Sequence, residues 1–415
     1  MSKRLEKKLV AGLDVGTSKV VAVIAEENLD GQLQIVGIGK HPSRGLKRGV
    51  VVNIDATVNA IQHAIEEAEL MAGTRIDSVH AGVAGSHVRS RNSTGIVAIR
   101  GNEVTEYDVS RVTDSAKAVA IPGDQEILHV VPQGYLIDTQ EAVHDPIGMA
   151  GVRLESRVHI VTGAVSAIQN VMKCIRQCGV EVSPETVVLE QLASSYAVLS
   201  DDEKELGVCL VDIGGGTTDI AVFVDGAIRH TAVIPIAGDQ VTNDLAHGLR
   251  TPIHFAEQIK IEFGCTGVLE GMPNDLIEVP SVGDRPGKRL SYADLAQYIG
   301  PRYEELFNLI HAELCRSGLL DQLTAGIVLT GGTSKIRGAV DLAEQIFEMP
   351  VRLGLPQHVQ GLADVIRNPI YSTAVGLVLY AAQEQHGSMG YTDIRGQNEK
   401  VNIWRRMKSW FQGHF

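Results

Sequence analysis

The feature that most constrains the fold is a short pattern that occurs twice in the chain. An apolar stretch over residues 8–13 runs into Asp14-Val15-Gly16-Thr17, and a second apolar stretch follows that turn. Residues 206–211 run in the same way into the segment from Asp212 to Asp219, which a further apolar stretch again follows. Each copy predicts a strand, a tight turn and a returning strand, then an Asp-Gly turn into a third strand. Repetition of such a unit indicates two lobes with a shared architecture.

Helical patterns follow each of these meanders. Residues 55–72 place apolar side chains at helical spacing on one face, and the pattern stops at Gly73. Alternation of strands with such helices is typical of an α/β fold. We therefore predict an α/β protein of two related lobes that face each other across a cleft.

Changes in pattern predict how the chain is divided. The first lobe is interrupted after Val83 by an insert of short strands, with a helix that opens on a capping-box sequence at Thr105. From Ala381 the composition turns polar and loses periodicity, as flexible linkers do. The predicted parts are a first-lobe core over 1–83 and 164–205, an insert over 84–163, a second-lobe core over 206–245 and 325–380, a helical subdomain over 246–324, a linker over 381–400 and a terminal helix over 401–415.

Bulk composition bears on the partners and the location of the protein. The chain has 37 basic and 50 acidic residues, a net charge of −13, which argues against a nucleic-acid partner because phosphate backbones attract concentrated positive charge. Five scattered cysteines suit a reducing compartment, and we expect Cys174 and Cys178 to be buried on a helix. The start of the chain lacks the apolar run of a signal peptide, and no stretch approaches the roughly 20 apolar residues of a spanning helix. We therefore expect a cytoplasmic body.

The two Asp-X-Gly turns have the composition of phosphate-binding loops. Glycine tolerates the positive φ that lets backbone N–H groups point at an anion, and neighbouring hydroxyls add donors. Either loop alone could be an ordinary tight turn, but the paired occurrence favours binding of a phosphate chain. The candidate donors are Gly16, Thr17, Ser18 and Lys19 in the first loop, and Gly214, Gly215, Gly216, Thr217 and Thr218 in the second.

An acidic residue stands at the start of each loop. Asp14 and Asp212 end their predicted strands, where carboxylates could hold the water shell of a magnesium ion that keeps most of its waters. A third glycine motif supports the same chemistry, because a buried strand over 327–330 runs into Gly331, Gly332 and Thr333 before a predicted helix from Lys335. The N-terminus of such a helix attracts anions.

Three motifs in this order, DVGTSK at 14, DIGGGTTD at 212 and LTGGTS at 329, resemble those of the actin, heat-shock chaperone and sugar-kinase superfamily. Within it the chain more closely resembles the FtsA family of bacterial cell-division actin homologues. That likeness rests on the position of the insert and on the segments 192–196 (LASSY), 301–303 (PRY) and 371–377 (YSTAVGL). The resemblance implies an actin-like ATPase fold with Mg-ATP in the cleft.

Further residue roles come from the resemblance alone. It implies that Glu257 and Lys260 contact the ribose and adenine and that Gly238 passes close to the nucleotide. Without the other motifs, Glu257 and Lys260 would be read as an ordinary surface pair three residues apart on a helix. Glu190 matches a position that polarises the attacking water in some members, which would make it a general base for slow ATP hydrolysis.

The last fifteen residues have a composition of their own. Helical spacing places Ile403, Trp404, Met407, Trp410 and Phe411 on one face and Arg405, Arg406, Lys408, Ser409 and Gln412 on the other. A terminal helix of this kind could dock on the protein's own core, but the polar linker before it argues against docking. We therefore predict reversible binding to an anionic membrane surface. The family resemblance implies the cytoplasmic face of the inner membrane at the division site.

The resemblance also implies partners. It implies self-assembly into filaments, recruitment of other divisome proteins, and binding of the C-terminal peptide of FtsZ, the tubulin-like ring protein, on the subdomain over 246–324. Lys288, Arg302 and Glu305 are the candidates by position, although such charges could also form an ordinary solvated face. A small-molecule kinase of the same fold, or a pilus-assembly protein like PilM, remains an alternative. A kinase, however, has no use for a tethered amphipathic helix, and no β-sandwich domain of a chaperone follows the lobes.

Overall fold

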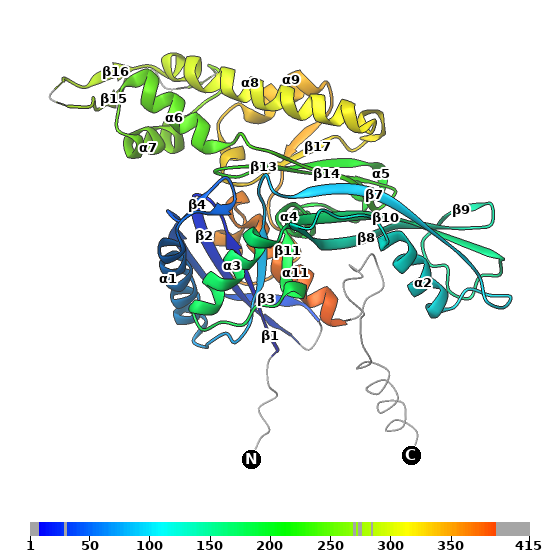
Figure 1. The fold of residues 1–415 in the computed structure, drawn as a ribbon. Coiled ribbons are helices and arrows are strands. Elements are labelled where there is room, and N and C mark those ends of the chain that lie inside the picture. Colours follow the sequence, from blue (N-terminus) through cyan, green and yellow to red (C-terminus); the bar gives the residue numbers. More distant parts are fainter. Residues whose placement is uncertain (1–7, 29–30, 269–270, 273–275, 284, 387–415) are drawn as a thin grey trace.

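The computed structural model describes residues 8–28, 31–268, 271–272, 276–283 and 285–386. Two five-stranded sheets form the cores of two lobes (Figure 1). The first has the order β11-β6-β1-β2-β3, with β1 Lys8–Val15, β2 Lys19–Glu27, β3 Leu33–Pro42, β6 His80–Val83 and β11 Val187–Leu189. The second has the order β14-β13-β12-β17-β18, with β12 Val208–Ile213, β13 Thr218–Val224, β14 Ala227–Ile234, β17 Ile327–Thr330 and β18 Val351–Leu353.

The two sheets have the same topology. β1 pairs antiparallel with β2 and parallel with β6, and β12 pairs antiparallel with β13 and parallel with β17. Asp14 and Asp212 therefore occupy equivalent places, one residue before the end of the first strand of each hairpin. The predicted α/β class with two related lobes is confirmed.

Helices cover the first-lobe sheet because its glycines let them approach closely. Helix α1 (Ile54–Ala72) packs on β3 and β2, and it ends at Gly73 in the left-handed conformation, as predicted. A Cβ at Gly39 on β3 would lie 1.9 Å from the carbonyl oxygen of Ala64 on α1, so only glycine fits there. Helix α3 (Val165–Gln177) packs beside α1 and buries Cys174. The short strands β4 (Leu46–Lys47) and β5 (Val50–Val51) complete this lobe.

The insert forms a separate antiparallel sheet beside the second lobe (Figure 1). Its strands lie in the order β7-β10-β8-β9, with β7 Arg89–Ala98, β8 Gln125–Ile137, β9 Gln140–Val143 and β10 Arg153–Ala164. Helix α2 (Glu106–Lys117) packs on β7 and β10. It begins at the predicted capping box, in which Thr105 Oγ1 accepts from the N–H of Asp108 and the Asp108 carboxylate accepts from the N–H of Thr105.

Helices dominate the outer part of the second lobe, which forms the top of Figure 1. The long helix α8 (Tyr292–Ser317) packs on α6 (Gly238–Leu249) and α9 (Ala339–Phe347), and α7 (Ile253–Phe263) packs on α6. The hairpin of β15 (Ile277–Val279) and β16 (Lys288–Leu290) lies at its far end.

Two helices cross between the lobes. Helix α4 (Glu190–Val198) contacts strands of both sheets, and α11 (Ser372–His386) packs against α4 and β1. A Cβ at Gly376 on α11 would lie 1.9 Å from the carbonyl oxygen of Ala193 on α4, so the two backbones nearly touch. The short helices α5 (Asp201–Leu206) and α10 (Ala363–Ile366) and the 3₁₀ turns Pro184–Thr186, Leu320–Gln322, Gly332–Lys335 and Pro369–Tyr371 connect the remaining elements.

Two details of the sequence prediction were wrong. The helix expected from Lys335 begins later, because Gly332–Lys335 forms a 3₁₀ turn and Gly338, at φ +80°, precedes the first residue of α9. The linker expected from Ala381 also begins later, because α11 continues to His386 and buries Ala381 and Ala382 against the first lobe. The predicted terminal helix over 401–415 lies outside the described residues. Among the helices that are described, none is both long and apolar enough to cross a membrane.

Candidate functional site

A cavity of about 680 Å³ opens between the two lobes and is lined by both repeated hairpins. The structure brings most of the predicted site residues into this one cleft: Asp14, Gly16, Thr17, Ser18, Lys19, Glu190, Asp212, Gly214, Gly215, Gly216, Thr217, Glu257, Lys260, Gly331, Gly332 and Thr333.

Two predicted residues do not line the cavity. Thr218 is the first residue of β13, and its buried hydroxyl donates to the carbonyl oxygen of Ile236 at 2.7 Å, so it points away from the cleft. Gly238 lies behind the second loop, where its N–H donates to the carbonyl oxygen of Gly214 at 3.2 Å. A Cβ there would lie 2.4 Å from Thr333 Oγ1, so Gly238 lets the two glycine motifs pack together.

The two loops touch each other across the cleft. Ser18 Oγ donates to Asp239 Oδ1 at 3.3 Å, which links the first loop to the start of α6. A Cβ at Gly215 would lie 1.8 Å from Ser18 Oγ, and one at Gly216 would lie 2.6 Å from Thr17 Oγ1. Close approach of the first loop therefore requires glycine at positions 215 and 216 of the second loop.

Four carboxylates gather at the base of the loops. Asp14, Asp212, Asp219 and Glu190 all line the cavity, and Asp212 accepts hydrogen bonds from Ser194 Oγ at 2.6 Å and Thr373 Oγ1 at 3.3 Å. Asp219 Oδ2 accepts from Thr217 Oγ1 at 2.9 Å, while Oδ1 is buried without a partner among the described residues.

Burial and mutual repulsion raise the pKa values of this cluster. Burial, with a contribution from the charge of Asp14, raises the pKa of Asp212 to about 6 although the bond from Ser194 opposes the shift. Burial and the Asp212 charge raise the pKa of Asp219 to about 8. Loss of solvent, followed by the charges of Asp14 and Asp219, places the pKa of Glu190 well above its usual value. Nearby positive charge is therefore too little to offset the burial and mutual repulsion of these carboxylates.

A cation beside this cluster is Lys19, whose Nζ lies 3.3 Å from Asp14 Oδ2 and donates to the carbonyl oxygen of Ile370 at 2.7 Å. Within the described residues no group of three or more His, Cys, Asp or Glu side chains is arranged to hold a metal ion. Carboxylates such as Asp14 and Asp212 are the oxygen ligands that hard divalent cations prefer, directly or through bound water.

The far end of the cleft holds a buried lysine. Lys260 Nζ lies 2.7 Å from Glu257 Oε2 and donates to Thr242 Oγ1 at 2.9 Å and to the carbonyl oxygen of Gly238 at 3.1 Å. Lys260 is only 6% exposed, so this is no ordinary surface pair. Its fixed position makes Glu257 and Lys260 suitable to orient a polar ligand.

Sequence reasoning missed several residues of the cleft. Asp219 closes the second motif, but nothing in its spacing distinguished it from a turn residue. Ser194 and Thr373 reach Asp212 from helices that are far apart in the sequence, and both lie within the segments that carried the family resemblance. Lys40, Lys335, Arg337 and Asn368 also line the cavity.

The candidate partner residues lie apart from the cleft lining. Arg302 on α8 donates from Nε to Asp244 Oδ2 at 2.6 Å and also pairs with Glu305. Lys288 at the start of β16 donates to the carbonyl oxygen of Leu249 at 3.2 Å. The structure thus joins Arg302 with Glu305 and directs Lys288 to the end of α6.

Comparison with known proteins identifies the family. The family described as cell division protein FtsA matches residues 209–376, and the one described as the SHS2 domain inserted in FtsA matches residues 85–162. A cell division protein FtsA from Pseudomonas aeruginosa is 60% identical over 412 residues, which cover 98% of each chain. This chain belongs to the FtsA family. FtsA of Neisseria meningitidis serogroup B is 50% identical over 415 residues and 99% of each chain.

Solved structures place this FtsA-family chain in the actin-like fold. It is similar to the PilM–PilN type IV pilus biogenesis complex at a TM-score of 0.66 and 17% identity, over 90% of this chain and 98% of that one. It is similar to MreB5 of Spiroplasma citri bound to ADP at a TM-score of 0.58 and 15% identity, over 92% of this chain and 99% of that one. At such identities the likeness concerns the fold alone. The expected actin-like fold is confirmed, and so is the resemblance to the FtsA family.

Proposed function

We propose that this FtsA-family chain binds Mg-ATP in the cleft and tethers the FtsZ ring to the cytoplasmic face of the inner membrane. Nucleotide binding is supported by the contact between two glycine-rich hairpins over a cluster of buried carboxylates. Such loops present N–H groups and hydroxyls to a phosphate chain. The proposed role in cell division is supported by membership of the FtsA family.

The phosphates would lie between the two loops, with the backbone N–H groups of Gly16, Gly215 and Gly216 and the charge of Lys19 around them. The N–H of Gly214 donates within its own loop to the carbonyl oxygen of Thr217 at 3.0 Å. Asp14 and Asp212 would hold the water shell of magnesium, and Asp219 joins them. Bound magnesium would neutralise phosphate charge and favour the ionised forms of these carboxylates. Gly331, Gly332 and Thr333 would contact the same ligand from the second lobe, and Glu257 and Lys260 would orient the ribose and adenine.

Glu190 is suited to a slow hydrolytic step. It is the first residue of α4, it lines the cleft, and its raised pKa moves it toward the range in which a general base works at neutral pH. In this proposal its carboxylate accepts a proton from the attacking water. Turnover unchanged in Glu190→Ala would count against that role.

Residues 401–415 supply the membrane contact in this proposal. Each of Arg405, Arg406 and Lys408 is worth about 1 kcal/mol near anionic lipid. Burial of the apolar face of Ile403, Trp404, Met407, Trp410 and Phe411 adds roughly 1.5 to 3 kcal/mol for each fully buried side chain. One such helix attaches reversibly. Assembly of several copies into a filament would make attachment firm through multivalency.

The FtsZ C-terminal peptide would bind the helical subdomain near Lys288, Arg302 and Glu305. The ion pairs of Arg302 with Asp244 and Glu305 fix a guanidinium at this surface, where a peptide carboxylate could compete for it. Other divisome proteins would bind elsewhere on the chain.

Electron microscopy on anionic lipid monolayers tests the proposal as a whole. Purified protein with ATP should form lipid-bound filaments and recruit FtsZ to the monolayer, and omission of ATP or of anionic lipid should reduce both. Absence of filaments and of recruitment would favour the alternative, a small-molecule kinase of the same fold.

A further inference from the structure

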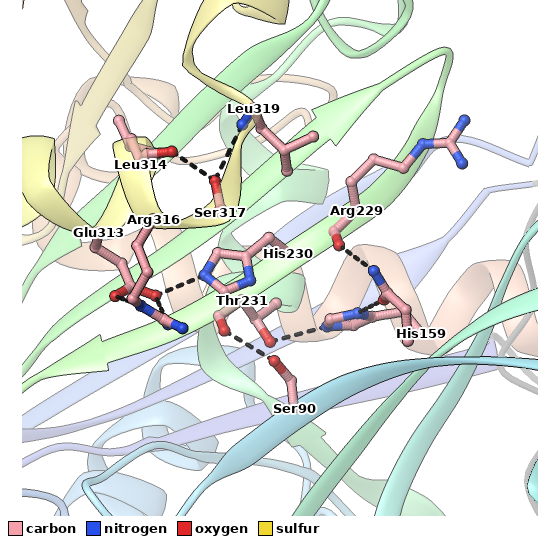
Figure 2. Close-up of polar contacts among 11 residues, drawn as sticks. Ser90, His159, Arg229, His230, Thr231, Glu313, Leu314, Arg316, Ser317 and Leu319 are labelled. Carbon is pink, nitrogen blue, oxygen red and sulfur yellow. Dashed lines mark hydrogen bonds and ion pairs between the residues drawn. The ribbon is translucent and has the colours of Figure 1, made fainter.

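The insert meets the second lobe along the outer edge of β14 (Figure 2). Ser90 Oγ donates to the carbonyl oxygen of Thr231 at 2.9 Å, and Asn92 Nδ2 donates to that of Arg229 at 3.1 Å. Gln133 Nε2 donates to the carbonyl oxygen of Ile228 at 2.8 Å. Side chains of the insert thus satisfy backbone carbonyls of an edge strand. We call this contact between Ser90, Asn92 and Gln133 of the insert and strand β14 the seam; it is a polar interface.

A buried histidine fixes this seam. His159 is 1% exposed and lies between Asn92 Oδ1, 2.7 Å from its Nδ1, and Thr231 Oγ1, 3.0 Å from its Nε2. Asn92 Oδ1 is an acceptor, so Nδ1 carries the proton and Nε2 accepts from the threonine hydroxyl. The insert and β14 are therefore held in one defined register.

A cavity of about 290 Å³ lies beside the seam, with walls from β7, β8 and β10 of the insert and from β14 and the end of α8. Its charged or titratable lining residues are Arg157 from the insert and Arg229 and His230 from the second lobe; among the described residues no carboxylate lines it. This is unusual in a chain with more acidic than basic residues. His230 pairs with Glu313 at 2.7 Å and Arg229 with Asp225 at 3.0 Å, but neither carboxylate lines the cavity. The lining itself therefore presents cationic side chains from both bodies of the protein.

Several donors at the cavity are free to bind a ligand. The Arg157 side chain is 55% exposed, and its nearest carboxylates, Glu155 at 3.8 Å and Glu141 at 3.9 Å, are too far for hydrogen bonds. Arg229 uses Nε on Val224 and Nη2 on Asp225, which leaves Nη1 without a partner among the described residues.

We propose that this cavity binds a phosphate group, which bridges the insert and the second lobe. Two arginines line the cavity, one from the insert and one from the second lobe, and the planar donor sets of guanidinium groups suit the oxygens of a phosphate dianion. The volume admits a small group and no nucleotide. Because the ligand contacts both bodies, its binding stabilises the position of the insert against β14. The phosphate could belong to a free metabolite or to a phosphorylated side chain.

Titration calorimetry with inorganic phosphate tests the site, in protein saturated with a non-hydrolysable ATP analogue so that the interlobe cleft is filled. Wild type should show saturable binding at constant ionic strength. Arg157→Gln and Arg229→Gln should each weaken it about tenfold or more, since each loses a charged donor. Arg153→Gln is the matched control, because Arg153 lies on the same strand β10 outside the cavity.

Hydrogen exchange supplies a second readout. Phosphate should slow amide exchange in β7 and β14 of the wild type and of Arg153→Gln, and should leave Arg157→Gln unchanged. Equal binding by wild type and Arg157→Gln, or equal protection by acetate, would overturn the proposal. Phosphoserine and inorganic phosphate distinguish the two sources, because tighter binding of phosphoserine assigns the site to a modified side chain and tighter binding of inorganic phosphate to a free ligand.

Discussion

The hydroxyl of Ser194 on α4 donates a 2.6 Å hydrogen bond to Asp212 Oδ2 at the end of β12. Thr373 on α11 donates to the same oxygen at 3.3 Å, and the two hydroxyls lie 3.1 Å apart. Both helices that cross between the lobes therefore contact one carboxylate of the cleft. The ionisation of Asp212 is linked to the positions of these helices.

Removal of the Ser194 hydroxyl should weaken binding of Mg-ATP. In Ser194→Ala the pKa of Asp212 rises further above about 6, so less of the carboxylate is ionised at neutral pH. A hydrogen bond to a charged group is worth about 1.5 to 3 kcal/mol, so we expect roughly tenfold weaker binding at pH 6.5 and a smaller loss at pH 8.5. Calorimetry at both pH values measures this. Ser195→Ala is the control, because Ser195 bonds to Leu192 away from the cleft; equal losses at both pH values would contradict the idea.

Asp219 should make the nucleotide-free protein less stable as pH rises. Its pKa is raised to about 8, so the native state keeps a proton between about pH 4 and 8 that the unfolded state releases, and the free energy of unfolding falls across this window. Asp219→Asn cannot titrate, so its urea midpoint in chelator should depend less on pH and exceed that of the wild type at pH 8. The exposed Asp202→Asn should behave like wild type. If Asp219→Asn and the wild type showed the same pH dependence, Asp219 would be ruled out as the group that lowers the free energy of unfolding as pH rises.

Gly376→Ala should destabilise the protein through the contact between α11 and α4. The new Cβ would lie 1.9 Å from the carbonyl oxygen of Ala193, so the helices must separate, at an expected cost of about 1 to 3 kcal/mol. Chemical denaturation gives the difference. Gly123→Ala is the control, since a Cβ there meets nothing within 4 Å. A change in Gly376→Ala no larger than that in Gly123→Ala would mean that the crossing adjusts freely.

His159 should make the protein sensitive to acid. Burial, followed by the charges of His230 and His129, lowers its pKa from 6.5 to about 3, so the unfolded state binds a proton that the native state excludes. The free energy of unfolding should therefore fall as pH decreases from 6.5 toward 3, by up to about 5 kcal/mol. His159→Gln keeps polar groups but does not titrate, and should lose less stability than wild type in the same acid range. His63→Gln, at an exposed site, should match wild type.

Trp410→Glu should abolish binding to anionic vesicles while ATP binding survives. The substitution places a charge on the predicted apolar face of the terminal helix, where burial in lipid is costly. Vesicle co-sedimentation measures the loss, and nucleotide affinity is measured on the same preparation. Gln412→Glu makes the same change of charge on the polar face and should retain most of the binding. Wild-type co-sedimentation by Trp410→Glu would refute membrane binding through this face.

Local patterns predicted the elements that depend on local chemistry. Helix α1 is capped by Gly73 and α2 by Thr105, as predicted, because capping is decided within a few residues. Asp14 and Asp212 were found because each stands in a repeated motif. The start expected for α9 was wrong because two consecutive glycines indicate a turn but do not fix where the next helix begins.

Long-range packing decided what the sequence could not. Ser194 and Thr373 act on Asp212 only after two helices cross, and Lys260 is buried only because Gly238 and Thr242 surround its amino group. The composition turns polar from Ala381, yet α11 continues to His386 because Ala381 and Ala382 pack on the first lobe.

The seam at β14 also bears on aggregation. An outer strand with open carbonyls is a template on which another chain can add, and proteins commonly cover such strands. Here no described strand pairs with the outer edge of β14; the side chains of Ser90, Asn92 and Gln133 each donate one hydrogen bond to a carbonyl oxygen of the strand. The insert thereby keeps the second-lobe sheet closed to unplanned strand addition, which matters most for a protein that is expected to be concentrated with its own copies on one surface.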